Sequence, residues 1–462
     1  MSINPDIFRE FSIRGIADQD LTDDVMVRIG WAVGCFFKRR RVTTLVIGRD
    51  VRHSSGRISC SLIRGLLQAG LRVIDVGVVP TPVQNFATDS LNAGGGIMVT
   101  ASHNPPEYNG LKIRTNHTLS GETLQSIYHL ASAYPQGEVP ENGSVERIDL
   151  LPDYLERIKA FARIEPSLDT GQPLKVVVDG GNGTNGRIVA GLLRDLGCLV
   201  VELFCEPDGS FPGRGPDPTA TGATEDLSAL VCAQKADLGL AYDGDGDRLV
   251  VVDEQGKRLL GDQIVMILAR DVLRHGPAKI VYEISCTQAL ADDVIAHGGE
   301  PVMTPTGYAF VHRAVDETGA VLGGELSGHL FFNKPDFRFD DAILGTIKLL
   351  DVVTQSQYPL SSMIAELPAY HSSPVLRVPC PDPIKANVIQ VVKTRFEDDY
   401  KIDTLDGVRI HFDDGWALVR QSNTQPVISM RFEARSAEQL KAIHTGVQTL
   451  VEAEIDRQRQ DE

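Results

Sequence analysis

The stretch Gly95-Gly96-Ile97-Met98-Val99-Thr100-Ala101-Ser102-His103-Asn104-Pro105 joins a short apolar run to a polar loop. An apolar run of this length, bounded by turn residues, is typical of a buried strand. Loops that leave the carboxyl edge of an α/β sheet are where ligands usually bind. Asn104-Pro105-Pro106 prevents a helix, because proline lacks the amide hydrogen and biases its predecessor toward extended backbone. The stretch therefore predicts an α/β fold that presents Ser102 and His103 on a stiff, non-helical loop.

Two interpretations of this loop are open. The hydroxyl of Ser102 could carry a phosphoryl group as the covalent intermediate of a phosphotransfer enzyme, with His103 beside it as a second candidate catalytic residue. An ordinary strand exit, in which the serine caps a turn, explains the same residues equally well. The choice between them depends on the rest of the chain.

Composition narrows the class of protein. The chain has 462 residues, which exceeds what one hydrophobic core usually serves, so two to four domains are expected. Its 45 basic and 62 acidic residues give a net charge of −17, which disfavours nucleic acid or an anionic membrane as a partner. The seven cysteines are scattered without CxxC spacing, which indicates a reducing compartment. With neither a signal peptide nor a membrane-length apolar stretch, we expect a cytoplasmic protein.

Short strands alternate with helical patterns in three successive units, which is typical of parallel sheets with crossover helices. After about Tyr370 the pattern changes to alternating strands and a closing helix from Ala437 to about Arg457, which predicts a smaller α+β domain. The Pro/Gly-containing stretch Tyr134 to Gly143 is interpreted as the first linker. The predicted domains are 1–152, 153–257, 258–367 and 368–462.

Asp243-Gly244-Asp245-Gly246-Asp247-Arg248 places three carboxylates at alternate positions after the predicted strand Leu238 to Tyr242. Three hard oxygen ligands suit Mg²⁺ or Ca²⁺. An EF-hand loop would use the same aspartates with Glu254, but its sixth position would be glycine rather than Arg248, and the flanking segments read as strands. A metal beside an arginine would neutralise charge during phosphoryl transfer.

Two further polar segments follow predicted strands. Arg420-Gln421-Ser422-Asn423-Thr424-Gln425-Pro426 offers a guanidinium, hydroxyls and backbone N–H groups suited to a phosphate, and Arg431 could add a second guanidinium. Gly324-Glu325-Leu326-Ser327-Gly328-His329 places Glu325 and Ser327 on one side of an extended backbone, where they could bind adjacent sugar hydroxyls. Each segment is unspecific alone, since polar turns before proline are common.

Taken in order, Thr100–Pro105, Asp243–Arg248, Gly324–His329 and Arg420–Pro426 resemble the α-D-phosphohexomutase superfamily, in particular its bacterial phosphomannomutase/phosphoglucomutase branch. The resemblance covers essentially the whole chain. It implies three related α/β domains with mixed sheets and a smaller C-terminal α+β domain, arranged as a heart-shaped molecule around a central cleft.

The resemblance also implies the roles of the site residues. Ser102 would be the phosphoserine and would bind one Mg²⁺ together with Asp243, Asp245 and Asp247. Lys112 and His329 match positions proposed for acid/base roles, and Arg14 and Arg248 would lie near the reacting phosphate. The remaining implied substrate contacts are Tyr308, Glu325, Ser327, Arg420, Ser422, Asn423 and Thr424. A hexose 1,6-bisphosphate would form as the intermediate, and the partner would be a small sugar phosphate bound by a monomer.

Some positions depart from the family pattern. Ser285, Pro305 and Tyr308 stand where lysine, lysine and histidine are usual, and Phe11-Ser12 replaces the more frequent Tyr-Asp. The expected reaction is interconversion of hexose 1-phosphates and 6-phosphates of glucose or mannose. The departures leave open a mutase for another sugar phosphate, such as a glucosamine or pentose phosphate. A sugar-phosphate-binding relative without turnover is a third possibility, which the intact serine and aspartates disfavour.

Overall fold

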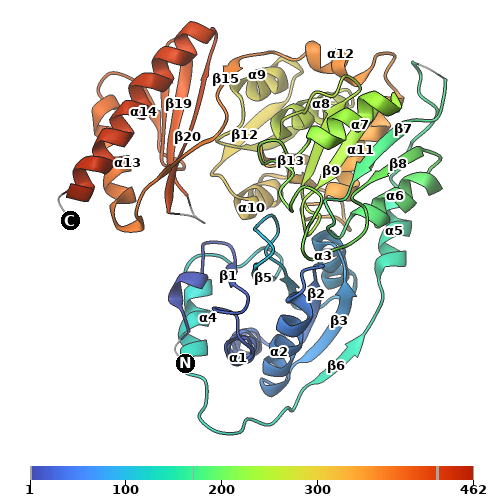
Figure 1. Cartoon of the computed structure of the whole chain (residues 1–462), viewed down its shortest axis with the longest axis vertical. Coiled ribbons are helices and arrows are strands. Elements are labelled where there is room, and N and C mark those ends of the chain that lie inside the picture. Colours follow the sequence, from blue (N-terminus) through green and yellow to red (C-terminus); the bar gives the residue numbers. More distant parts are fainter. Residues whose placement is uncertain (1–2, 170, 423–425, 461–462) are drawn as a thin grey trace.

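The computed structural model describes residues 3–169, 171–422 and 426–460, and these form four successive domains. In Figure 1 the first domain (blue) lies below the second and third, and the fourth (red) stands beside the third. The predicted architecture of three α/β domains with mixed sheets and a smaller α+β domain is confirmed. Within the described residues, no helix combines the length and apolar character needed to cross a bilayer.

The first domain contains a six-stranded mixed sheet. Strand β2 buries both of its faces: Leu45 and Ile47 pack toward helices α1, α2 and α4, whereas Val46 packs toward α3. This alternation is the period of two expected of a strand covered on both sides. In spatial order the strands are β1 (Ile13–Ile16), β5 (Tyr108–Arg114), β4 (Gly96–Val99), β2 (Thr44–Arg49), β3 (Arg72–Val78) and β6 (Ser144–Arg147). The helices are α1 (Asp23–Arg39), α2 (Ser55–Gln68), α3 (Thr81–Ser90) and α4 (Glu122–Ser132), after a short η1 (Pro5–Ile7).

The second and third domains each contain a four-stranded sheet of the same design. Their strands are β10 (Leu249–Asp253), β9 (Leu238–Tyr242), β7 (Lys175–Asp179) and β8 (Leu199–Leu203), and then β12 (Glu300–Thr304), β11 (Lys279–Glu283), β13 (Leu322–Gly324) and β14 (Leu330–Phe332). The second domain has helices α5 (Leu151–Lys159), α6 (Gly186–Asp195) and α7 (Glu225–Gln234). The third has α8 (Gly261–Leu273), α9 (Gln288–Ala296), α10 (Tyr308–Thr318), α11 (Ala342–Thr354) and α12 (Leu360–Ala365).

One connection recurs in all three sheets and positions the polar loops. A strand that runs parallel to the central strand is followed directly by an antiparallel neighbour: β4 by β5, β9 by β10, and β13 by β14. The loops in these connections contain Ser102, the three aspartates and Glu325–His329. Because the connection is the same each time, each loop leaves its sheet at the carboxyl end of an equivalent strand.

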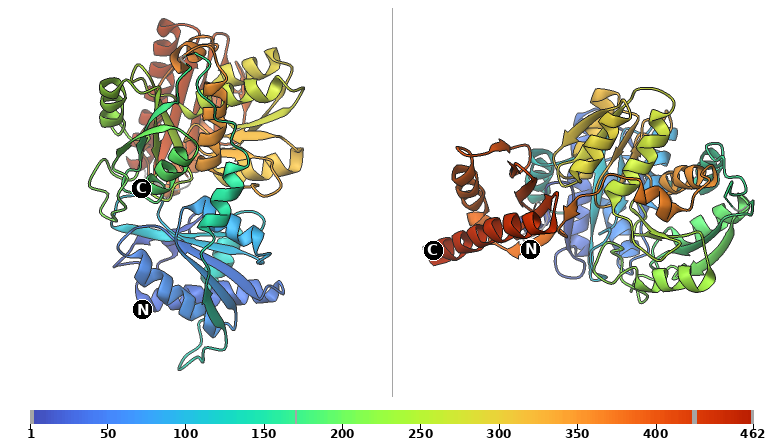
Figure 2. Two further views of the ribbon diagram at one scale, coloured as in Figure 1. Left: turned by 90° about the vertical axis from the view of Figure 1, so that its right-hand side faces the viewer. Right: turned by 90° about the horizontal axis from the view of Figure 1, so that it is seen from above.

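The fourth domain is an antiparallel sheet with two helices and has its own core. Its elements are β15 (His371–Ser372), β16 (Leu376–Pro379), α13 (Asp382–Phe396), β17 (Lys401–Asp403), β18 (Val408–Phe412), β19 (Gly415–Gln421), β20 (Val427–Ala434) and α14 (Ala437–Gln460). Figure 2 shows it beside the three α/β domains. The first three domains instead share one continuous hydrophobic core, which runs from α3 through the second and third sheets.

Buried arginines of the fourth domain contact the third. The fully buried Arg409 lies over the Trp416 ring at 4.1 Å and donates to the Ile284 carbonyl at 3.0 Å. Arg431 donates to the Ser285 carbonyl and lies 3.4 Å from Asp262 Oδ2. Arg431, expected as a second guanidinium for the phosphate, has a side chain that is 2% exposed and contacts the third domain.

Two local predictions differ from the structure. The stretch Tyr134 to Gly143 is not an interdomain linker but a loop that leads into β6, which pairs in parallel with β3 of the first sheet. The connection to the second domain follows β6, and α5 begins at Leu151, close to the predicted boundary after residue 152. The predicted strand from His371 to Val378 is divided into β15 and β16, since Pro374 cannot donate to a ladder.

The shared core contains a buried polar link whose loss can be measured. Tyr154 of α5 donates to both carboxylate oxygens of Asp341, at 3.0 and 2.9 Å, and Asp341 caps α11 by accepting from two backbone N–H groups. We expect Tyr154→Phe to lower the free energy of unfolding by about 1–3 kcal/mol, because a buried carboxyl group loses a hydrogen-bond donor. Urea unfolding measures this change. Tyr358→Phe, at a residue 59% exposed, serves as control, and equal effects of the two substitutions would contradict the expectation.

Candidate functional site

Buried hydrogen bonds hold the loop of Ser102 in a fixed conformation. Ser102 has a φ of 51°, a left-handed conformation that costs a non-glycine residue about 1–3 kcal/mol. Its N–H donates to Thr100 Oγ1 at 2.8 Å, and that hydroxyl donates to Asp50 Oδ2 at 2.7 Å. The buried Arg52 pairs with Asp50 and donates to the carbonyls of residues 102, 104, 105 and 108. The predicted stiff loop is therefore present, and a buried arginine enforces it.

The Ser102 hydroxyl points across the domain boundary to the aspartate loop. Its Oγ donates to Asp243 Oδ2 at 2.7 Å and lies 3.2 Å from His103 Nδ1. Burial, with the positive charges of Arg248 and Arg14 nearby, lowers the pKa of His103 well below its usual range. Because the serine proton goes to Asp243, a neutral His103 ring protonated at Nδ1 would donate to Ser102 Oγ.

The three aspartates are completely buried and face one another. Asp243 Oδ1 accepts backbone N–H groups from residues 246, 247 and 248 at 3.1, 3.1 and 3.2 Å. One oxygen from each aspartate lies within 4.8 Å of the others, which is the spacing of a metal-binding group. Burial, together with the charges of Asp245 and Asp247, raises the pKa of Asp243 to about 8. The carboxylates thus repel one another strongly in the absence of a cation.

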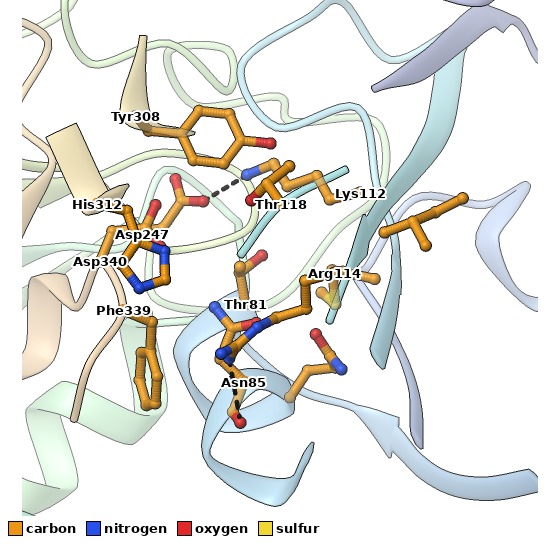
Figure 3. Close-up of a pocket in the computed structure, with 13 residues that line it drawn as sticks. Thr81, Asn85, Lys112, Arg114, Thr118, Asp247, Tyr308, His312, Phe339 and Asp340 are labelled. Carbon is orange, nitrogen blue, oxygen red and sulfur yellow. Dashed lines mark hydrogen bonds and ion pairs between the residues drawn. The ribbon is translucent and has the colours of Figure 1, made fainter. Parts of the chain in front are cut away.

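Lys112 of β5 supplies a positive charge to this loop from the first domain. Its Nζ donates to Asp245 Oδ2 at 2.7 Å and also to Asp247 Oδ2. Figure 3 shows Lys112 reaching Asp247 next to the Tyr308 ring. Although burial alone would lower it, the two aspartates raise the pKa of Lys112 well above its usual range.

The third domain supplies His329. Its Nδ1 lies 2.7 Å from Glu325 Oε2, and its Nε2 lies 3.3 Å from Asp247 Oδ1. Burial opposes protonation, but Asp247 and Glu325 outweigh it and raise the pKa of His329 to about 10. Ser327 Oγ lies 3.2 Å from the same Glu325 oxygen. The imidazole is therefore positively charged at neutral pH and joins the second and third domains.

Other predicted residues border this group. Arg14 Nη1 donates to Asn104 Oδ1 at 3.0 Å in the serine loop, and Arg248 Nε lies 3.9 Å from Asp243 Oδ2. Tyr308 stacks on His329 with ring centroids 5.6 Å apart, and its hydroxyl donates to the Phe11 carbonyl at 3.2 Å. The structure thus brings Arg14, Ser102, His103, Lys112, Tyr308 and the aspartate and glutamate loops into one region.

The predicted phosphate loop lies against the third domain. Arg420 Nε donates to Thr306 Oγ1 at 3.1 Å and to Asp406 Oδ2 at 2.9 Å, so its guanidinium is already partly neutralised. The Ser422 carbonyl accepts from Lys385 Nζ at 3.1 Å. Asn423 and Thr424 lie outside the described residues. Next to Thr306, the Gly307 N–H donates to Glu325 Oε1 at 3.0 Å, so this segment contacts the loop Glu325–His329.

Sequence reasoning missed several residues of the site. Asp50 and Arg52 directly follow β2, and polar residues at the carboxyl end of a strand were the signal that could have identified them. Asp340 is buried beside Asp247 and His329, with its Oδ2 3.8 Å from His329 Nε2. It follows no strand and belongs to no motif, so its sequence context contains no comparable signal.

The donor set fits a hard divalent cation. Asp245 Oδ1 is buried and has no hydrogen-bond partner among the described residues, so a negatively charged oxygen is available in the interior. Carboxylate and hydroxyl oxygens are the ligands that Mg²⁺ takes in proteins. The cluster is therefore suited to a metal, with Ser102 Oγ adjacent to it.

Comparison with known proteins agrees with this geometry. Four family models match the chain: phosphoglucomutase/phosphomannomutase α/β/α domain I at residues 5–137, domain II at 152–256, domain III at 260–370 and the C-terminal domain at 376–448. The phosphomannomutase/phosphoglucomutase of Pseudomonas aeruginosa is 40% identical over 444 residues, which cover 95% of this chain and 94% of the relative. The phosphoglucomutase of Neisseria gonorrhoeae is 36% identical over 459 residues, 98% of each chain.

Solved structures show the same similarity. A phosphoglucomutase/phosphomannomutase family protein from Burkholderia thailandensis superimposes with a TM-score of 0.87 at 36% identity and covers 98% of both chains. An N-acetylphosphoglucosamine mutase of Aspergillus fumigatus, solved with GlcNAc-6P and magnesium, has a TM-score of 0.60 at 15% identity, covers 98% of this chain and 96% of that one, and shares the fold alone. With all four domains matched in order and relatives similar over nearly their full length, the chain belongs to the phosphoglucomutase/phosphomannomutase family of the α-D-phosphohexomutase superfamily.

Proposed function

We propose that this hexose-phosphate mutase carries the transferred phosphoryl group on Ser102 and acts on both glucose and mannose phosphates. The observation that supports this most directly is the Ser102 hydroxyl, which is held in a left-handed backbone conformation and points at Asp243 from 2.7 Å. The names of the most similar relatives support the choice of sugars.

In the proposed reaction, phospho-Ser102 donates its group to a hexose monophosphate. The bond from phosphorus to the serine oxygen breaks as a bond to a sugar hydroxyl oxygen forms, and the hydroxyl proton passes to a nearby base. The resulting hexose 1,6-bisphosphate then reorients in the site, so that its two phosphates exchange places. The phosphate that the substrate originally carried is transferred to Ser102. This sequence needs one place where transfer occurs and a second place where the other phosphate is held.

Residues of all four domains would share this work. Mg²⁺, when bound by Ser102, Asp243, Asp245 and Asp247, would neutralise charge on the transferring group. Arg14 and Arg248 would contact the reacting phosphate, while Lys112 and His329, which contact the aspartate loop, would exchange a proton with substrate. Glu325, Ser327 and Tyr308 would contact the sugar. Arg420 and Ser422, with Asn423 and Thr424, would hold the second phosphate.

We also propose a cytoplasmic monomer whose domain boundaries follow residues 152, 257 and 367. The seven cysteines are free thiols, which is consistent with a reducing compartment. Lys112, the aspartate loop and His329 all come from one chain and complete one cluster, so the site does not need a second subunit.

Ser102→Ala tests the covalent role. We expect conversion of glucose 1-phosphate and of mannose 1-phosphate to the 6-phosphates to fall by at least about 10³-fold, since the carrier oxygen is gone. Ser126→Ala, which removes an exposed hydroxyl of α4 in the same domain, is the control and should keep wild-type rates. Retained turnover in Ser102→Ala would refute the proposal. If the wild type acted only on a glucosamine or pentose phosphate, that compound would be the substrate in place of the glucose and mannose phosphates.

Lys112→Met separates proton transfer from metal binding. With Mg²⁺ in excess, we expect kcat to fall by about 10²-fold or more, as is typical when a general acid or base is lost. Calorimetry should show Mg²⁺ binding at least as tightly as in the wild type, because the ammonium group no longer competes for Asp245 and Asp247. Lys348→Met, which removes a partly buried lysine paired with Asp351, is the matched control. An unchanged kcat in Lys112→Met would exclude Lys112 from the chemistry.

A further inference from the structure

Two histidines and an aspartate meet where the first domain touches α10 of the third. His117 lies in the loop that follows β5, and its Nε2 is 2.9 Å from Asp316 Oδ2. His312 Nε2 is 3.8 Å from the same oxygen. One ligand atom of each residue lies within 4.8 Å of the other two. His312 and Asp316 are four residues apart on α10, so both side chains project from one face of the helix.

These distances suit a tetrahedral metal ion. Zinc binds imidazole nitrogen and carboxylate oxygen at about 2.0–2.2 Å, which places neighbouring tetrahedral ligand atoms about 3.3 Å apart. The two measured separations, 2.9 and 3.8 Å, lie on either side of that value. Two nitrogen ligands disfavour Mg²⁺, which takes oxygen ligands, and favour Zn²⁺ among the common divalent ions.

His312 has a free nitrogen aimed into the group. The residue is 5% exposed, and its Nε2 has no hydrogen-bond partner in the described part of the chain. The ring stacks on Phe331 with ring centroids 5.9 Å apart, which restricts its orientation. Arg114 lines the same cavity as His312. Arg114 is itself paired with Asp89 at 3.3 Å.

We propose that His117, His312 and Asp316 form a second metal site, distinct from the aspartate loop, that takes Zn²⁺ and joins the first domain to the third. Three protein ligands leave the fourth tetrahedral position to water. His117 reaches the site from the first domain, so bound zinc clamps this loop to α10.

The proposed site lies close to the catalytic residues without including them. His312 lines a cavity of about 20 Å³ together with Lys112, Tyr308 and Asp340, and Figure 3 shows it in this wall. Tyr308 begins the helix that contains both proposed ligands, and β5 contains Lys112 and leads into the loop of His117. A clamp at this point therefore connects the two elements that approach the aspartate loop from opposite sides.

Zinc uptake by the full-length enzyme tests the site. The protein is stripped of metal, supplied with excess Mg²⁺ to occupy the aspartate loop, and dialysed against Zn²⁺; bound zinc is then counted by elemental analysis. Wild type is compared with His117→Ala, with the shape-conserving Asp316→Asn, and with His371→Ala as a control for an exposed histidine in the fourth domain. Asp243→Asn reports any zinc that enters the aspartate loop. Circular dichroism checks the fold of each variant.

We expect wild type, His371→Ala and Asp243→Asn to bind one zinc ion more than His117→Ala. Affinity in Asp316→Asn should fall by at least about 10-fold, since even the loss of a partner outside the ligand set costs roughly that much. Zinc should also raise the Tm of the wild type and leave that of His117→Ala unchanged. The proposal is overturned if His117→Ala takes up as much zinc as the wild type, or if the extra zinc is lost only in Asp243→Asn.

Discussion

The structure depends on the burial of three carboxylates in one six-residue loop. Asp243, Asp245 and Asp247 are all fully buried, and like charges at such short range in a medium of low dielectric repel one another strongly. The loop itself offers only Arg248 in compensation. Lys112 from the first domain and His329 from the third complete the neutralisation, so the domains are joined by the electrostatic need of this loop. The same buried carboxylates form a cluster that could hold a divalent cation.

The chain uses the same strand connection in three domains to position the loops of this site. A parallel strand followed by an antiparallel neighbour occurs in each of three sheets, and the connecting loop contains the serine, the aspartates or the glutamate and histidine. The three loops contact one another through Ser102, Asp247 and His329. The fourth domain has a separate core and contacts the third through Arg409 and Arg431. Arg420 adds a contact from the same domain to Thr306 of the third.

Much of this arrangement could be predicted from the sequence because its signals are local. The strand before Ser102, the spacing of the aspartates and the order of the four loops are all contained in short segments, and the fold class follows from their alternation with helices. The residues that were missed depend on distant partners. Arg52 acts by holding carbonyls about 50 positions away, and Asp340 matters only because Asp247 and His329 lie beside it. The contact of Arg431 with Ser285 likewise joins residues far apart in the sequence, so no local signal predicts it.

The sequence does not show which groups pair with the arginine side chains expected to bind phosphate. Arg420 has a guanidinium group suited to binding phosphate. In the structure it pairs with Asp406, fourteen residues earlier, and with Thr306 of another domain. A buried guanidinium requires a partner when no phosphate is present. Which carboxylate provides it is decided by the packing of the third and fourth domains.

The central claim is that Ser102 is the phosphoryl carrier, and intact-mass spectrometry after incubation with glucose 1,6-bisphosphate tests it most directly. The account predicts a species heavier by one phosphate group in the wild type, with the modification mapped to Ser102 by peptide analysis and absent in Ser102→Ala. A wild-type protein that never gains this mass, or a phosphate that maps to another residue and persists in Ser102→Ala, would contradict the account.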